Sequence, residues 1–89
     1  MFNINQILEQ AVEKEASDVH LILESKPMCR VGNVLVKMEG APVLKEKDMY
    51  EIYNYMINGN NIKDKVFQNT KKLDMIYNYN GNNFGVNIS

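Results

Sequence analysis

Two short turn signals constrain the fold of this chain more than any other feature of its sequence. Gly32-Asn33 lies between two apolar segments, residues 28–31 and 34–38. Asn80-Gly81 lies between residues 73–79 and a segment in which apolar residues alternate with polar ones. A glycine in the first position of a two-residue loop favours a type II′ turn, and Asn-Gly favours a type I′ turn. Both turns join antiparallel strands, so the sequence predicts two β-hairpins and an antiparallel sheet.

Apolar residues at helical spacing predict the elements that pack on this sheet. The first predicted helix has Ile4, Ile7, Leu8, Ala11 and Val12 on one face, and the second has Met49, Ile52, Tyr53, Met56 and Ile57. A shorter helix is expected over residues 62–68, and a further strand over residues 19–24. The predicted order is α-β-β-β-α-α-β-β. The fold class is therefore α+β, with helices packed on an antiparallel sheet.

Length and composition limit the class of protein. Eighty-nine residues make one domain, and 45% hydrophobic with 24% charged residues is typical of a globular one. A net charge of −1 disfavours a nucleic-acid-binding domain, which normally has a strong basic excess. The single cysteine, Cys29, excludes an internal disulfide, and no apolar run is long enough to span a membrane. We expect a cytoplasmic protein.

The residues that could carry chemistry are few. None of the five glycines is followed by the Gly-Lys-Ser/Thr of a phosphate-binding loop, so this chain has no means of its own to cradle a triphosphate. There is one histidine, His20, which excludes a His-pair metal motif. Asp18 and His20 would share a face of a strand, and we interpret both as structural, with Asp18 holding the turn from helix to strand. Cys29 is interpreted as a buried, inert thiol.

Several segments in order along the chain resemble one known family. The first is Ala16-Ser17-Asp18-Val19-His20-Leu21, which resembles the A-S-D-hydrophobic-H-L box of the type IV pilus and type II secretion ATPases. The others are Lys26–Val34, with Arg30 and Gly32 at family positions, Pro42–Asp48, Leu73–Tyr77 with Asp74, and Phe84-Gly85-Val86-Asn87. Together they cover nearly the whole chain. The leading helix resembles the pilus-retraction branch of this family, the branch associated with twitching motility.

The resemblance implies that residues 1–89 are an N-terminal, PAS-like domain, cut before a RecA-like ATPase domain. In that family the RecA-like domain binds ATP and Mg²⁺, six subunits form a ring, and the N-terminal domain packs on the ATPase domain of a neighbour. The implied partners are that ATPase domain and the pilus or secretion platform proteins of the inner membrane, which places the protein in the cytoplasm or at the inner face of the membrane. The family-box residues Ser17, Asp18, His20, Arg30, Gly32 and Asp74 are interpreted as structural.

One departure from the family pattern concerns nucleotide. The family places arginines in and just before its F-R-V-N strand, where they reach toward ATP, and here Asn83 and Gly85 occupy those positions. We therefore expect this chain alone to be no enzyme and to hold no metal or cofactor, while the parent protein is expected to be an ATPase. The alternative is a free-standing PAS-like module that binds a small ligand or a protein. A P-loop encoded beyond Ser89 would separate the two hypotheses.

Overall fold

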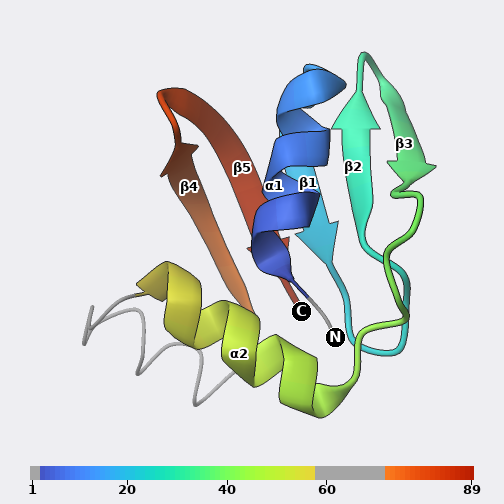
Figure 1. The fold of residues 1–89 in the computed structure, drawn as a ribbon, viewed down its shortest axis with the longest axis vertical. Helices are drawn as coiled ribbons and strands as arrows, with labels where there is room; N and C mark the ends of the chain where they lie inside the picture. The colour runs from blue at the N-terminus through green and yellow to red at the C-terminus, as the bar shows by residue number, and fades with distance from the viewer. Residues whose placement is uncertain (1–2, 58–71) are drawn as a thin grey trace.

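The computed structural model describes residues 3–57 and 72–89. In chain order its elements are α1 (Ile4–Glu13), β1 (Asp18–Leu21), β2 (Met28–Val31), β3 (Val34–Lys37), α2 (Glu46–Ile57), β4 (Leu73–Tyr79) and β5 (Asn82–Ile88). Figure 1 shows α1 lying across one face of the sheet and α2 running along one end of it. The α+β prediction is confirmed. The short helix expected over residues 62–68 lies outside the described residues.

The strands form one five-stranded sheet in the order β3-β2-β1-β5-β4. Three neighbouring pairs are antiparallel, as expected from the hairpins, but β1 and β5 run parallel. The sheet is therefore mixed, where the sequence predicted an antiparallel one. The hairpin turns determine only the pairs they join, and the β1–β5 pair joins segments from opposite ends of the chain, for which no turn signal exists.

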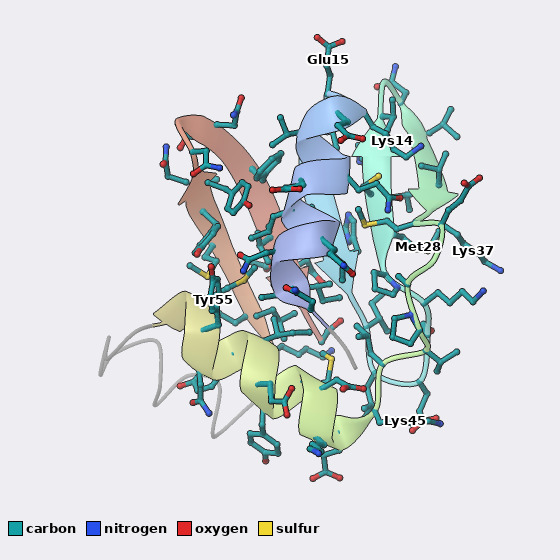
Figure 2. The ribbon with its side chains drawn as sticks, in the orientation of Figure 1. Lys14, Glu15, Met28, Lys37, Lys45 and Tyr55 are labelled. Carbon is teal, nitrogen blue, oxygen red and sulfur yellow. The ribbon has the colours of Figure 1, made fainter. Side chains whose placement is uncertain are left out.

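α1 has a defined start and a defined end. The Asn3 side chain accepts a hydrogen bond from the Asn5 backbone N–H at 2.9 Å, which caps the helix. At the other end the Ala16 N–H donates to the Ala11 carbonyl and the Glu15 N–H to the Val12 carbonyl, which is a Schellman motif. Glu15 takes the left-handed conformation that this motif requires, with φ of 56°, and projects from the end of the helix (Figure 2).

β1 is shorter than the predicted strand over residues 19–24. It ends at Leu21, whose carbonyl accepts a hydrogen bond from Ser89 N–H at 2.9 Å. The chain then turns: Ser25 N–H bonds to the Ile22 carbonyl, and Glu24 has a left-handed φ of 65°. The apolar run that favoured a longer strand therefore continues into a turn, where Leu23 is exposed.

Both predicted hairpin turns are present. Val31 pairs with Val34 across Gly32-Asn33, and φ is positive at Gly32 (63°) but not at Asn33, which is the type II′ pattern. Tyr79 pairs with Asn82 across Asn80-Gly81, where both φ values are positive, which is the type I′ pattern. These turns fix the registers of β2–β3 and β4–β5.

α2 completes the core. Lys45 N–H donates to Asp48 Oδ2 at 2.9 Å, an interaction typical of a helix start. The apolar face predicted for this helix is buried at Met49, Ile52, Tyr53 and Met56. Tyr55, which Figure 2 shows pointing from α2 toward the start of α1, donates its hydroxyl to Asn5 Oδ1 at 2.7 Å. The two helices thus contribute to one core and are joined by a hydrogen bond.

Candidate functional site

The two faces of the sheet carry different side chains. Toward the helices lie Val19, Leu21, Cys29, Val86 and Ile88, all buried. On the other face, which neither described helix covers, no side chain of these strands is fully buried. We call this second surface the open face. It is the candidate functional site, because it displays charged and amide side chains that are not part of the buried core.

Two rows of side chains cross the open face from β3 to β4. Strand pairing places Leu35, Arg30, Asp18, Gly85 and Ile76 in one line, which we call the Asp18 row. It places Lys37, Met28, His20, Asn87 and Asp74 in the next line, which we call the His20 row. The rows bring together residues from every segment that carries a strand.

Asp18 is the centre of its row. The Ser17 hydroxyl donates to Oδ2 of Asp18 at 2.8 Å, and Arg30 Nε lies 3.5 Å from the same oxygen. Both side chains of the ion pair are 39% exposed, so water weakens the attraction and leaves both charges accessible to a partner. Asp18 was expected to hold the turn after α1. The backbone bonds of Glu15 and Ala16 close that turn, and Asp18, the first residue of β1, bonds to Ser17 within it.

Gly85 makes room for the Asp18 carboxylate. A Cβ atom on Gly85 would lie 2.5 Å from Asp18 Oδ1, so any larger residue would force the carboxylate aside. This is one of the two positions where the resemblance places an arginine. At the other, Asn83 Oδ1 accepts a hydrogen bond from Asn78 Nδ2 across the β4–β5 hairpin at 3.0 Å. Arg30 lies in the same row as Gly85, on the other side of Asp18, and comes from a different strand.

The His20 row contains a buried nitrogen without a bond. Nε2 of His20 is shielded from solvent and bonds to no other described residue. His20 lies between Met28 on β2 and Asn87 on β5, and Asn87 Nδ2 in turn donates to Asp74 Oδ1. The prediction that Asp18 and His20 share a face of the strand is confirmed. Within the described residues no hydrogen bond joins the Asp18 carboxylate to Nε2 of His20.

The remaining family-box residue, Gly32, lies away from the rows. It forms the β2–β3 turn, where its φ of 63° is costly for any residue with a side chain.

Asn87, Met28 and Lys37 belong to the open face but were not singled out as site residues. The strict alternation of sides along each strand would have found them once the strand pairing was known.

The open face offers groups that can hydrogen-bond and form ion pairs. A shallow depression of about 380 Å³ lies over β1, β5 and β4, with Asp18, His20, Asp74 and Asn87 along it. Within residues 3–57 and 72–89, no three His, Cys, Asp or Glu side chains are placed to hold a metal ion. Cys29 is on the helix-covered side, where burial raises the pKa of its thiol. The arrangement suits binding of a polar surface.

Comparisons with known proteins do not identify the chain. No protein-family model matches it, and no curated protein has a significant match to it. Neither helix in the described part of the chain is long and apolar enough to cross a membrane.

Proposed function

We propose that this chain is the N-terminal, PAS-like domain of a hexameric motor ATPase of the type IV pilus or type II secretion class, and that its open face contacts the RecA-like ATPase domain. One observation carries the proposal. The family-like residues of four separate segments, namely Asp18 and His20, Arg30, Asp74, and Asn87, lie in two adjacent rows on one surface. Residues needed only for folding would be distributed over the core instead.

The chemistry of the open face supports a protein partner. The half-exposed Asp18–Arg30 pair offers both signs of charge within one row, and Asp74 with Asn87 offers an acceptor and an amide in the next. Charged and amide groups of this kind determine orientation and specificity at a protein interface more than they determine affinity. The domain would therefore orient the motor domain, while ATP and Mg²⁺ are bound by the RecA-like domain.

The first test is the coding sequence beyond Ser89. The proposal expects an in-frame P-loop, a glycine-rich loop followed by Lys and Ser/Thr, in the following domain. A coding sequence that continues without such a motif, or that stops, would contradict the proposal and favour the free-standing PAS-like module.

The second test measures contact directly. The RecA-like domain encoded beyond Ser89, or its homologue from the same genome, is titrated with the 89-residue chain in a calorimeter. Arg30→Glu should weaken binding by about tenfold or more, because it reverses a charge in the contact surface. Lys45→Glu is the matched control, since Lys45 also forms an ion pair, with Glu24 at 2.9 Å, but lies at the start of α2 (Figure 2). Equal losses from both variants, or no binding by the unaltered chain, would refute the contact.

We also predict that the isolated chain neither binds nor hydrolyses ATP. Phosphoryl transfer requires preorganised backbone donors, a lysine on the phosphates and a held metal, and the positions at which family arginines would help are Asn83 and Gly85. Calorimetry with ATP and Mg²⁺ at physiological salt should give no saturable heat. Saturable binding at low micromolar ATP would show that this chain contributes its own nucleotide site.

A further inference from the structure

The two edge strands of the sheet expose the most accessible large apolar side chains of the described residues. Ile76 on β4 is 71% exposed and Val34 on β3 is 61% exposed. Figure 1 shows β3 and β4 at opposite ends of the sheet, and no described strand pairs with the outer edge of either. An edge strand presents unpaired backbone N–H and C=O groups, which can pair with another chain.

β4 has few of the features that normally prevent such pairing. Its seven residues contain neither lysine nor proline, and its pairing with β5 is continuous from Leu73 to Tyr79, without a bulge. β3 has Lys37 at its end, and no described carboxylate lies within ion-pair distance of that lysine. A lysine there disfavours pairing of two β3 edges but suits an acidic partner strand.

We propose that copies of this chain associate head to tail, the outer edge of β3 in one copy pairing with the outer edge of β4 in the next. The directions of the strands allow this. β3 runs parallel to β1 and β5, and β4 runs opposite to them, so a second copy continuing the sheet in the same orientation places β3 antiparallel to β4.

The side chains are complementary in the register that continues both rows. Extending the Asp18 row places Leu35 of one copy opposite Ile76 of the next, and extending the His20 row places Lys37 opposite Asp74. On the helix-covered side the same register places Val34 opposite Tyr77. Apolar pairs and an opposite-charge pair across strands each stabilise a sheet. A single register therefore pairs the apolar residues at the ends of the Asp18 row and the opposite charges at the ends of the His20 row.

Pairing of two β4 edges is less complementary. An antiparallel β4–β4 pair centred on Ile76 would place Asp74 opposite Asn78, which leaves the carboxylate without a cation and leaves Val34 and Leu35 exposed. Head-to-tail contact also differs from β4–β4 pairing in its symmetry. Because it uses two different surfaces of each copy, it builds open chains of copies or a ring rather than a closed dimer. The inference goes beyond the proposed motor function and does not depend on it.

The decisive experiment uses two edge variants, followed by sedimentation velocity. Because a pair of short strands buries less area than a stable interface, the chain is measured up to about 1 mM. The unaltered chain should form species larger than a dimer as concentration rises. Ile76→Lys blocks the β4 edge and Val34→Lys blocks the β3 edge, so each alone should be monomeric, with association weakened by about tenfold or more. Val43→Lys, at an exposed apolar position outside both edges, is the control and should associate normally.

Mixing the two variants separates the possible pairings. Head-to-tail contact leaves one good edge in each variant, so an equimolar mixture should form a heterodimer that grows no further. If Val34→Lys still dimerises alone, the β4 edges pair with each other and the proposal is wrong. If Ile76→Lys still dimerises alone, the β3 edges pair, which also overturns it. An unaltered chain that stays monomeric at every concentration overturns it as well.

A charge exchange tests the register. Lys37→Glu and Asp74→Lys should each weaken association by about threefold or more, and the chain carrying both should regain it. Circular dichroism checks that each variant is folded. Association that is weakened further in the double variant would exclude the register proposed here.

Discussion

The helix-covered face and the open face of the sheet are made by the same five strands, yet they use their side chains in opposite ways. On the covered face Val19, Cys29 and Val86 are almost completely buried and contribute through the area they remove from water. On the open face Asp18, Arg30 and Asn87 keep polar groups at the surface. The comparison shows that the covered face supplies the buried core, whereas the open face leaves polar groups available at the surface.

The largest expected effect is a loss of stability that differs between the two faces, and it can be measured with one leucine from each face. Leu21→Ala removes a side chain that is fully buried, and should lower the free energy of unfolding by about 3 kcal/mol. Leu35→Ala makes the same chemical change on the open face, where the side chain is exposed, and should cost less than about 0.5 kcal/mol. Urea unfolding of both variants gives the two values. Similar losses would mean that the open face also holds the fold together.

A smaller effect is expected where the open face is tightly fitted. Gly85→Ala should cost about 1 kcal/mol, because the added Cβ displaces the Asp18 carboxylate from the Ser17 hydroxyl and from Arg30. In a chain that already carries Asp18→Ala the same change should cost much less. The coupling is read from a double-mutant cycle of unfolding free energies. Costs that simply add would show that Gly85 and Asp18 do not interact.

A change at the end of α1 should stabilise the chain without touching either face. Glu15 holds a left-handed φ of 56°, which glycine adopts without steric cost, so Glu15→Gly should raise the free energy of unfolding by about 0.5–1 kcal/mol. Lys14→Gly, at a neighbouring position with an ordinary helical φ of −86°, should instead be destabilising. Thermal unfolding of the two variants distinguishes them. A loss from Glu15→Gly would mean that the Glu15 side chain itself matters.

The weakest expected effect is a dependence of stability on pH that arises from the covered face. Burial raises the pKa of Cys29, partly opposed by the charge of Lys14. As pH rises past the ordinary thiol pKa, the unfolded chain loses this proton before the folded chain does, so stability should fall above about pH 9. Cys29→Ala should show a shallower fall. Part of the slope should remain, because burial and the contact with Tyr55 also raise the pKa of Tyr77.

What could be predicted from sequence follows the range of the interactions involved. The apolar stripe of α1 and both hairpin turns depend on neighbours within a few residues, and each was predicted. The parallel pairing of β1 with β5 depends on segments far apart in sequence, so it was missed. The same limit applied to the candidate site: Asp18, His20, Arg30 and Asp74 were named individually, but their arrangement in two rows required the pairing. Leu23 shows a third limit on prediction. Its apolar side chain favoured a longer strand, but it lies in an exposed turn.

The parallel β1–β5 ladder also has a consequence for how the chain folds. It places Val19 beside Val86 in the middle of the sheet, so the central ladder closes a loop that spans most of the chain. Closing so long a loop costs chain entropy before the contact repays it, which slows folding. During synthesis the β2–β3 hairpin can form early, but the β1–β5 ladder cannot form until β5 has also been made. Until then one edge of β1 stays unpaired, and this interval is when a nascent chain is most exposed to misassociation.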